Sequence, residues 1–533
     1  MLEVIVIPLT VFRQPSNVRV HTELARHTIR ARNSKSVWQH EDIGVATRLK
    51  DDGLHVELSS PKSAVRYVEL RWQQRVPERM KYLGDHWERG YGDLSWTGMT
   101  PDKPMPWYFF VFDGAEIFGC GVKTGAQAFC WWNVDPHGIT LWMDVRSGGV
   151  GVRLGSRKIE MATVVERLSQ ENETTYEAAT HFTAMLCDQP LLPKQPVYGA
   201  NNCYYDPSYD HRSRERILQD TKLLADLAGN SANRPFSMID DGWENASSLA
   251  ASPWRSGNER FPDMAGLAGQ IKKIGARPGI WYRPLLANQD VPKSWILAGR
   301  QSLVGQGKSI MDPTIPEVLE RIKQDVARMV DWGYELIKYD DTTHDTLGYW
   351  GEIMGSRITG DGWQFSDQSR TNAEILMSIY SAIRQSAGET LLMGCNTVGH
   401  LCAGHVHIQR IGDNTSGHEW LRTRKMGINS LAFRGMQHGH LFATDADCVG
   451  LTSQIPWRLN DQWMELLAAS GTSMFVSTQS NYVKEKQKTA LSRAYDRASR
   501  PQPLVQPIDW IENSCPTRWK SGEEFFEFNW WNA

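Results

Sequence analysis

The sequence lacks a strong charge of either sign. Its 58 basic and 61 acidic residues give a formal net charge of −3 over 533 residues. Such a chain has no electrostatic affinity for a nucleic acid or an anionic membrane surface. Long apolar runs are also missing, because the segment 4–12 is too short to span a bilayer, contains Pro8 and follows Glu3. We therefore expect no nucleic-acid and no membrane partner, and we interpret 4–12 as a first strand.

Cysteine is scarce and shows no pairing pattern. The eight cysteines are scattered without C-x-x-C spacing, which argues against a zinc ribbon or a disulfide scaffold. This distribution favours a reducing compartment and so a cytoplasmic protein, with a periplasmic or secreted one as the alternative if a signal peptide was removed. No glycine-rich phosphate loop follows the early strands of the second half, so dinucleotide and P-loop functions lose support. We expect no cofactor and no metal.

Tryptophan is abundant instead. The chain has 22 tryptophans, dispersed along its whole length. Indole faces suit the apolar faces of pyranose rings, although many indoles in a chain of this size belong to its core.

Residues 1–185 are predicted to form an all-β domain. Short apolar or alternating runs recur between turn signals, which is typical of a β-sandwich. The expected strands are 4–12, 53–58, 65–72, 107–112, 116–122, 128–133, 139–145 and 159–166, followed by a helix at 174–186. The glycine-rich loop 82–96 either lends Trp87 or Trp96 to a neighbouring pocket or is a surface loop with two packed tryptophans.

The proline-punctuated segment 186–196 is predicted to be a linker. Strands and helices alternate after it, so we expect a (β/α)8 barrel over 197–500 and a short C-terminal β segment over 501–533. The expected strands are 197–203, 236–240, 277–282, 335–340, 391–396, 408–413, 440–444 and 473–477, and the expected helices are 213–228, 264–274, 316–332, 370–386, 419–431 and 462–469.

Charged residues gather where these strands end. Lys338 and Asp340 lie two positions apart in a buried strand, so they share one face while Tyr339 points the other way. The carboxyl ends of parallel barrel strands are where such enzymes carry their catalytic groups. An isolated K-x-D is more often a solvated pair on a loop, but here several other strands end in the same manner.

Five strand-end motifs in register resemble the retaining α-galactosidase clan, nearest to glycoside hydrolase family 36. The matching segments are D-D-G-W at 240–243, G-I-W-Y-x-P at 279–284, M-D-P-x-x-P-E-V at 311–318, K-Y-D at 338–340 and D-N-T at 413–415, with a later D-x-D at 445–447. The resemblance covers about 195–480, and the preceding sandwich agrees in kind.

The resemblance implies a role for each residue. Retention of configuration requires an ionised carboxylate that attacks the anomeric carbon and a protonated one that donates to the leaving oxygen, about 5–5.5 Å apart. By resemblance Asp340 is the nucleophile and Asp413 the general acid/base. Asp240 and Asp241 would accept hydrogen bonds from the hydroxyls at C4 and C6, with pairing of Asp240 to Lys338 as the structural alternative. The remaining substrate-binding residues would be Trp243, Trp281, Arg283, Lys338, Cys395 and Arg410.

Two departures from the family concern the substrate. Arg283 stands where the third-strand motif usually carries an acidic residue, and the glycine-rich run that usually follows the fifth-strand cysteine is replaced by residues 396–400. Both lie near the expected C2 side of the sugar or its aglycone. The resemblance therefore implies an exo-acting hydrolase for terminal α-hexosides, most readily galactosides, with α-glucosidase, α-N-acetylgalactosaminidase or glycosyl transfer as alternatives.

Two further functions compete with this one. The H-x-H pairs 405–407 and 438–440 have the spacing of metal ligands, which would suit a metal-dependent barrel hydrolase, although histidines in loops are the commoner origin of such pairs. A non-catalytic sugar-binding protein would keep the tryptophans but need not keep both Asp340 and Asp413. In each case the expected partner is an oligosaccharide or glycoside, and a homo-oligomer is compatible with the sequence.

Overall fold

The N-terminal part of the computed structural model is a β-sandwich, as the sequence predicts. The structure describes residues 9–31, 36–204, 212–245, 252–288, 291–301 and 308–531. The strands of the sandwich are β1 Asn17–Thr22, β2 Arg26–Ala31, β3 Val37–His40, β4 Ile43–Lys50, β5 Gly53–Ser59, β6 Val65–Gln73, β7 Lys81–Gly84, β8 Met105–Pro106, β9 Tyr108–Phe112, β10 Ile117–Val122, β11 Phe129–Asp135, β12 Gly138–Asp144 and β13 Lys158–Leu168.

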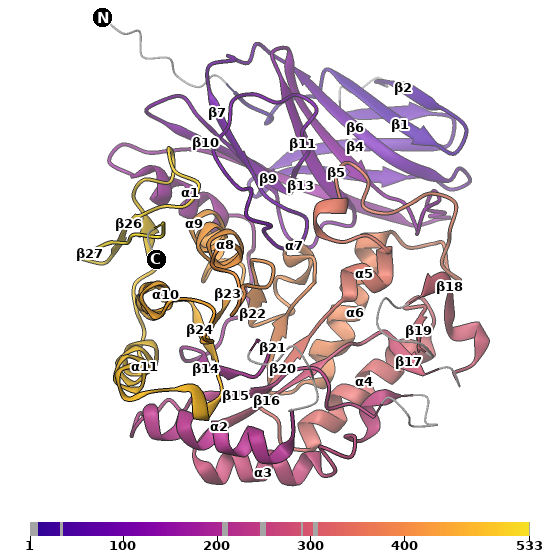
Figure 1. Ribbon diagram of the computed structural model, residues 1–533. Helices are drawn as coiled ribbons and strands as arrows, with labels where there is room; N and C mark the ends of the chain where they lie inside the picture. The colour runs from indigo at the N-terminus through magenta and orange to yellow at the C-terminus, as the bar shows by residue number, and fades with distance from the viewer. Residues whose placement is uncertain are drawn as a thin grey trace, which may run out of the picture.

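These strands are hydrogen-bonded in the order β7-β9-β10-β13-β5-β4-β3-β2-β1-β6-β12-β11-β8 and fold over into two layers (Figure 1). Strand β1 shows the alternation that produces two layers, because Val18 and Val20 are fully buried in the core between the layers, while Arg19 between them is not. Residues 9–12 of the predicted first strand 4–12 are not in a strand, and positions 1–8 lie outside the described residues. The segment 4–12 is apolar but does not alternate between apolar and polar residues, whereas β1, the first strand, does.

The second unit is a closed eight-stranded parallel barrel, which confirms the predicted fold class. Its strands are β14 Tyr198–Asn201, β15 Phe236–Ile239, β16 Arg277–Tyr282, β20 Leu336–Tyr339, β21 Leu391–Gly394, β22 Ile408–Arg410, β23 Ala443–Gly450 and β24 Ser473–Ser477. Pairing of β24 with β14 closes the ring. Strand β23 lies later than the predicted 440–444, because Asp445 and Asp447, which disfavour a strand in isolation, are buried beside the guanidinium of Arg410.

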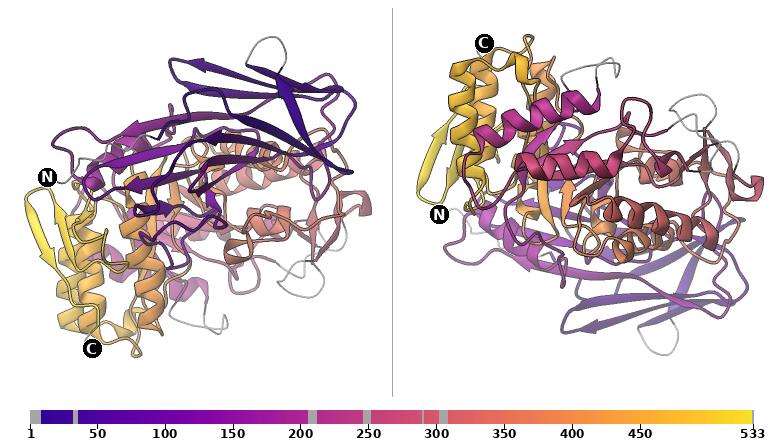
Figure 2. Two further views of the ribbon diagram at one scale, coloured as in Figure 1. Left: turned by 90° about the horizontal axis from the view of Figure 1, so that it is seen from above. Right: turned by 90° about the horizontal axis from the view of Figure 1, so that it is seen from below.

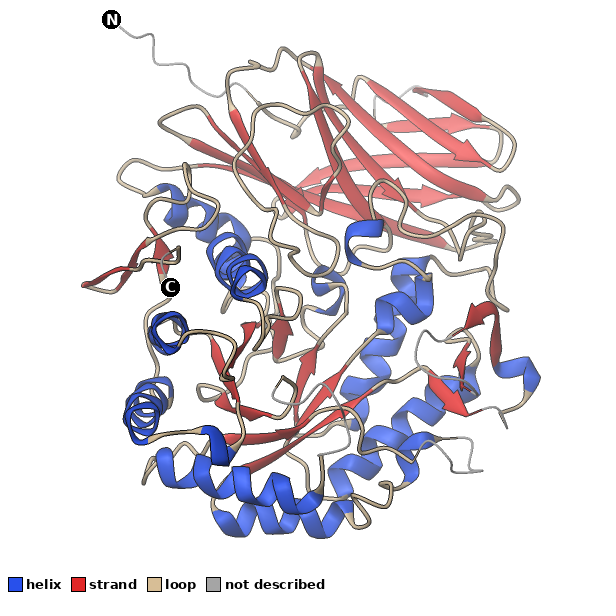
Figure 3. Ribbon diagram, viewed as in Figure 1, coloured by secondary structure: helices blue, strands red, loops and turns tan. Residues whose placement is uncertain are grey.

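Helices surround the barrel (Figure 3). They are α2 Arg214–Leu227, α3 Met264–Ile274, α4 Pro316–Asp331, α5 Thr342–Leu347, α6 Asn372–Ser386, α7 Gly399–Cys402, α8 Trp420–Arg422, α9 Ser430–Arg434, α10 Trp457–Ala469 and α11 Glu485–Ala498. The predicted helix 419–431 is interrupted, since a π-helical segment, η5 Thr423–Asn429, lies between α8 and α9. The helix α1 Thr175–Ala184 follows the sandwich and has a capping box at Thr174.

Two small sheets complete the structure. One is inserted after β16 and consists of β17 Leu286–Asn288, β18 Ile296–Gln301 and β19 Lys308–Met311. The other is the C-terminal β segment, with β25 Gln506–Pro507, β26 Arg518–Ser521 and β27 Glu524–Glu527. In the described part of the chain, we find no helix with both the length and the apolar character that crossing a membrane requires.

The sandwich lies against one end of the barrel, opposite α2 and α3 (Figures 1 and 2). This is the carboxyl end of the strands, because Gly90 of the loop 85–104 bridges to Gly412, two residues after β22. Gly90 N donates to Ile411 O at 2.7 Å, and Asp413 N donates to Gly90 O at 2.9 Å. The carboxyl end of the barrel is therefore built from both units.

A buried arginine joins the two units at this contact. From the barrel, the Nη1 atom of Arg434 donates to the carbonyl oxygens of Glu88 and Ile411 at 2.9 and 2.7 Å. Its Nε atom pairs with Asp85 of the sandwich at 2.8 Å. Both side chains are almost fully buried, so each charge depends on the other for compensation.

We expect Arg434→Met to lower the free energy of unfolding by about 3–5 kcal/mol, because it leaves the Asp85 carboxylate buried without its cation. Thermal denaturation of the purified protein measures this loss. The matched control is Arg500→Met, which removes an arginine from an exposed pair with Asp496 and should cost at most about 0.5 kcal/mol. Equal melting temperatures for the two variants would show that this contact does not hold the units together.

Candidate active site

The carboxylate of Asp340 lies at the end of β20 and is held on both oxygens. Its Oδ2 accepts a hydrogen bond from Trp281 Nε1 at 2.9 Å. Its Oδ1 accepts from Asn396 Nδ2 at 2.5 Å and from the backbone N–H of Asp341 at 2.8 Å. Two donors from the neighbouring strand ends and one from its own backbone therefore fix the orientation of this side chain.

The surroundings of Asp340 favour its ionised form. Burial by itself raises the pKa of this carboxyl, but the charge of Lys338, the hydrogen bond from Trp281 and the charge of Arg89 together lower the pKa below its usual value. Tyr339, between Lys338 and Asp340 in sequence, is fully buried against the ring of Tyr380, as the alternation predicts. A buried carboxylate kept ionised by neighbouring donors is the form that a nucleophile requires.

Lys338 forms a buried ion pair with Asp240. The distance from Nζ to Asp240 Oδ2 is 2.8 Å. Burial raises the pKa of Asp240, but the charge and hydrogen bond of Lys338 outweigh it and lower the pKa to about 2. The structural alternative for Asp240 is thus realised, and its other oxygen accepts from the backbone N–H of Asp241 at 3.1 Å.

Asp241 is bound differently from its neighbour. Its Oδ1 accepts from Arg212 Nη1 at 2.8 Å, and its side chain is about one-third exposed. Burial and the charge of Asp240 raise the pKa of Asp241 to about 6, against the opposing effect of Arg212. The two adjacent carboxyls therefore titrate in different pH ranges, which the sequence alone does not reveal.

Asp413 follows β22 and contacts two arginines. Its Oδ1 lies 3.0 Å from Arg89 Nη2, and its Oδ2 accepts from Arg422 Nη2 at 2.6 Å. Arg89 comes from the sandwich and is buried, with Glu88 at 3.3 Å on its other side. Arg422 comes from α8 and its side chain is 38% exposed. One oxygen of Asp413 is thus held by a fixed cation and the other by a cation at the surface.

Burial dominates the chemistry of Glu88. It raises the pKa of this carboxyl to about 7, against the lowering effect of the Arg89 charge. The residue is fully buried. Glu88 is therefore a second acidic group near Asp413 whose charge changes around neutral pH.

Arg283 forms the opposite wall with two carboxylates. It binds Asp345 through Nε and Nη2 at 2.9 and 2.6 Å, and its Nη1 lies 3.1 Å from Asp341 Oδ2. Burial and the charge of Asp340 raise the pKa of Asp341 to about 8, although Arg283 lowers it. The arginine that replaces the usual acidic residue is thus compensated by two aspartates of the next strand end.

Two residues in contact with Asp340 have a strained backbone. Asp341 and Asn396 have φ angles of 58° and 48°, in the left-handed region that non-glycine residues rarely adopt. The carbonyl of Asn396 accepts from Thr343 N at 3.1 Å and Thr343 Oγ1 at 2.9 Å, which holds this conformation. The strain directs the Asn396 side chain at Asp340.

A cavity of about 330 Å³ opens between these residues, a size suited to a small ligand. It is lined by Arg89, Arg283, Asp341, His344, Trp350, Asn396, Asp413, Asn414 and Arg422. Of the predicted site residues, Asp413 and Arg283 line this cavity, and Asp340 is tied to it through Asn396.

Three other predicted site residues do not line this cavity but lie behind the residues that do. Trp243 is fully buried and donates to Trp281 O at 2.9 Å, so it supports the strand that carries Trp281. Cys395 is buried, and burial raises the pKa of its thiol. Arg410 lies 2.8 Å from Asp447 and donates to Asn414 Oδ1 at 2.8 Å. Trp243 and Arg410 therefore position other residues of the site.

The loop 85–104 reaches the site, but not with a tryptophan. Trp87 packs among aromatic rings of the sandwich and donates to Gly355 O at 2.9 Å. Trp96 packs edge-on to Trp510 at 5.2 Å. Arg89, two residues after Trp87, is the side chain that enters. A glutamate and an arginine next to two glycines, inside a loop otherwise rich in aromatics, are the sequence signal for it.

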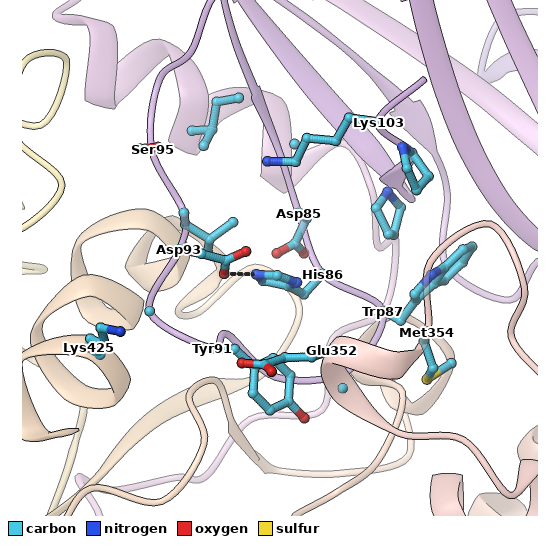
Figure 4. A pocket seen from close by; sticks show the side chains of 17 residues that line it. Asp85, His86, Trp87, Tyr91, Asp93, Ser95, Lys103, Glu352, Met354 and Lys425 are labelled. Carbon is cyan, nitrogen blue, oxygen red and sulfur yellow. Dashed lines mark hydrogen bonds and ion pairs between the residues drawn. The ribbon is translucent and has the colours of Figure 1, made fainter. Parts of the chain in front are cut away.

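A second cavity of about 450 Å³ lies on the other side of this loop (Figure 4). His86 and Asp93 line it and are paired with each other, with His86 Nε2 2.8 Å from Asp93 Oδ1. Tyr91 lines it and contacts Trp350 with its ring at 6.2 Å. Since Trp350 lines the first cavity, the two cavities are neighbours.

One histidine of each H-x-H pair accepts a hydrogen bond from a backbone N–H. His407 Nδ1 accepts from Leu392 N at 3.1 Å, and His438 Nδ1 accepts from Thr444 N at 3.1 Å. Burial lowers the pKa of both rings to about 4. Among the described residues, no group of three or more histidine, cysteine, aspartate or glutamate side chains is arranged to hold a metal ion.

Neither a family model nor a curated protein sequence matches the chain. Solved structures do. The α-galactosidase TtGalA from Thermus thermophilus, in complex with p-nitrophenyl α-D-galactopyranoside, is 17% identical with a TM-score of 0.61, covering 96% of this chain and 99% of its own. The family 36 α-galactosidase AgaA from Geobacillus stearothermophilus is 12% identical with a TM-score of 0.59, covering 96% and 80%.

An α-galactosidase from Lactobacillus brevis is 11% identical with a TM-score of 0.57, covering 91% of this chain and 73% of its own. All three combine low identity with coverage of nearly the whole chain. The expected sandwich-plus-barrel architecture is thereby confirmed, and the chain has the fold of the α-galactosidases of glycoside hydrolase family 36.

Proposed function

We propose that the protein is a retaining exo-acting glycoside hydrolase that cleaves terminal α-linked hexoses, with galactosides as its preferred substrates. The observation that carries this proposal is Asp340, a buried carboxylate held ionised beside a cavity that a second carboxylate, Asp413, lines. The complex of TtGalA with p-nitrophenyl α-D-galactopyranoside, on the same fold, supports the choice of sugar.

In the first step an Asp340 oxygen attacks the anomeric carbon, and Asp413 gives its proton to the departing glycosidic oxygen. The bond to the leaving group breaks as the ester to Asp340 forms. In the second step Asp413 takes a proton from water, which attacks the same carbon and releases the sugar with its original configuration. A sugar hydroxyl in place of this water would give transfer by the same intermediate.

The two arginines have different roles at Asp413, because each binds a different oxygen. Arg89 is buried between Glu88 and Asp413, so its guanidinium stays in place and orients Oδ1 of Asp413. Arg422 is at the surface and occupies Oδ2. We assign Arg422 as the partner that leaves Oδ2 when a protonated Asp413 meets the glycosidic oxygen. Trp350, 36% exposed at the cavity mouth, is placed to contact the leaving group.

Sugar recognition is assigned to the second strand end. Asp241 is partly exposed, so we assign it to accept from a sugar hydroxyl. The two oxygens of Asp240 accept from Lys338 and from the Asp241 N–H, so a hydroxyl would use their remaining lone pairs. We keep the hydroxyls at C4 and C6 as their partners. Arg283, bound on both sides by aspartates, faces the cavity as a donor where the family has an acceptor, so it is the residue assigned to discriminate among related hexosides.

The stereochemistry of the reaction tests the proposal. NMR at early times, on p-nitrophenyl α-galactoside, α-glucoside and N-acetyl-α-galactosaminide, should show the α-anomer as the first sugar released, fastest from the galactoside. Asp331→Asn, an exposed change at the end of α4, serves as the control and should leave the rate unchanged. A β-anomer as first product contradicts the double displacement.

The two carboxylates should respond differently to the leaving group. Asp340→Ala should abolish nearly all turnover on every substrate, with rescue by azide on activated ones, because it removes the nucleophile. Asp413→Ala should slow poor leaving groups by roughly 10²–10⁴-fold and spare nitrophenolates, which depart without a proton. Steady-state rates over a series of aryl leaving groups measure this, and parallel losses in both variants would refute the division of roles.

The acid limb of the pH profile should report the pKa of Asp340. Trp281→Phe removes a donor to the ionised carboxylate, so the pKa of Asp340 rises and a higher pH is needed to ionise it. The acid limb of kcat/KM should move upward by about one pH unit, equivalent to about 1.4 kcal/mol. Trp254→Phe is the matched control, because this buried indole packs 5.7 Å from Trp281 and its Nε1 atom has no hydrogen-bond partner among the described residues. An unshifted limb in Trp281→Phe would mean that another group sets it.

A further inference from the structure

A large cavity that shares no lining residue with the active-site cavity is lined by one face of the sandwich. It has a volume of about 680 Å³. Its floor consists of side chains from β1, β6, β11 and β12, and its walls come from residues 101–102 and from the barrel loop 356–361. Cavities at the contact between two structural units are common places for ligands.

The floor consists of side chains that point away from the sandwich core. On β12, Leu141 and Met143 are fully buried while Trp142 is only half-buried. Trp142 pairs across strands with Trp131, and their rings are parallel at 5.4 Å. Tyr67 meets Trp131 edge-on at 6.3 Å. Trp131 is only 3% exposed and lies beneath the partly exposed rings of Trp142 and Tyr67, which form the aromatic part of the floor.

The polar atoms of these rings are not used within the described structure. Tyr67 Oη and Trp142 Nε1 have no hydrogen-bond partner among the described residues, and both side chains are partly exposed. By contrast Trp132, the neighbour that points into the core, donates its Nε1–H to Trp107 O at 3.1 Å. An aromatic body with a free polar tip is suited to a ligand that is apolar on one side and polar at its edge.

The polar groups around the aromatic surface are held in position. Asn133 Nδ2 donates to the carbonyls of Pro101 and Lys103 at 3.0 and 3.1 Å, which fixes its amide. Arg66 is ion-paired with Asp361 across the contact between the two units. Asp102 and Arg357 stand exposed at the rim. Because both signs of charge face the cavity, its lining favours a neutral ligand with many hydroxyls over an anion or a cation.

Two chain segments connect this cavity with the active site. Trp350 lines the active-site cavity, and Ser356 and Arg357 of the same segment line the sandwich cavity. Trp87 packs against Trp131 at 6.0 Å, and Arg89, two residues later, contacts Asp413. A sugar chain bound by the sandwich is therefore held by the same segments that shape the catalytic end of the barrel.

We propose that this cavity is a second, non-catalytic carbohydrate site that binds neutral oligosaccharides. The partly exposed rings of Trp142 and Tyr67, with Trp131 packed beneath Trp142, provide the contact surface for a pyranose, and Asn133, Asp102 and Arg357 bind its hydroxyls. Its effect is to raise the local concentration of substrate near the catalytic cavity. The choice of α-galacto-oligosaccharides as its occupant rests on the proposed function, whereas the cavity itself does not.

Calorimetric titration of the full chain tests this site. The Asp340→Asn variant, titrated with the tetrasaccharide stachyose, should show two binding events, one of which a monosaccharide galactoside does not compete for. In this background Trp142→Ala and, as a milder change, Asn133→Ala should each weaken that second event at least tenfold. Trp531→Ala, which removes an exposed indole of the C-terminal segment, is the matched control and should leave it unchanged.

Kinetics separates this site from the active site. With Asp340 intact, Trp142→Ala and Asn133→Ala should leave kcat/KM for p-nitrophenyl α-galactoside unchanged and raise KM for stachyose by several-fold. A single binding event, or variants that bind stachyose as the parent does, would overturn the second site. Binding at the cavity without hydrolysis of any glycoside would instead overturn the proposed function and leave this site standing.

Discussion

Arg89 is the contact on which the catalytic end of the barrel depends. Its guanidinium, carried by the sandwich, lies 3.0 Å from Asp413, and the same loop forms backbone hydrogen bonds with the end of β22. A buried guanidinium is favourable only where carboxylates compensate it, and here Glu88 and Asp413 do so. The packing of the sandwich on the barrel therefore also fixes the position of Asp413, the proposed acid/base residue.

Much of this arrangement follows from the sequence, because its causes are local. Lys338 and Asp340 interrupt an apolar strand two residues apart, and this spacing places them on one face. The alternation of strands and helices after residue 196 predicts the barrel for the same reason. The bounds of strand β23 do not follow from the sequence. Its two buried aspartates are stable in a strand only because Arg410 compensates their charge, and the sequence does not show this contact.

The contacts that sequence reasoning missed join residues far apart in the chain. Arg89 and Asp413 are separated by more than three hundred positions, and no periodic pattern links them. Trp243 and Cys395 were expected in the pocket, yet both are buried behind its wall. Motif resemblance identifies which strand ends matter but does not say which side chains turn inward, because that depends on packing between elements.

The bridge between Gly90 and Gly412 has a consequence for the modularity of this protein. In many multidomain enzymes an accessory domain can be removed and the catalytic domain still turns over, because every reacting group and its counter-charge belong to one fold. Here the barrel alone contains both carboxylates but not the cation that orients the second. The sandwich thus supplies a buried cation to the proposed acid/base residue, and the barrel by itself lacks this contact.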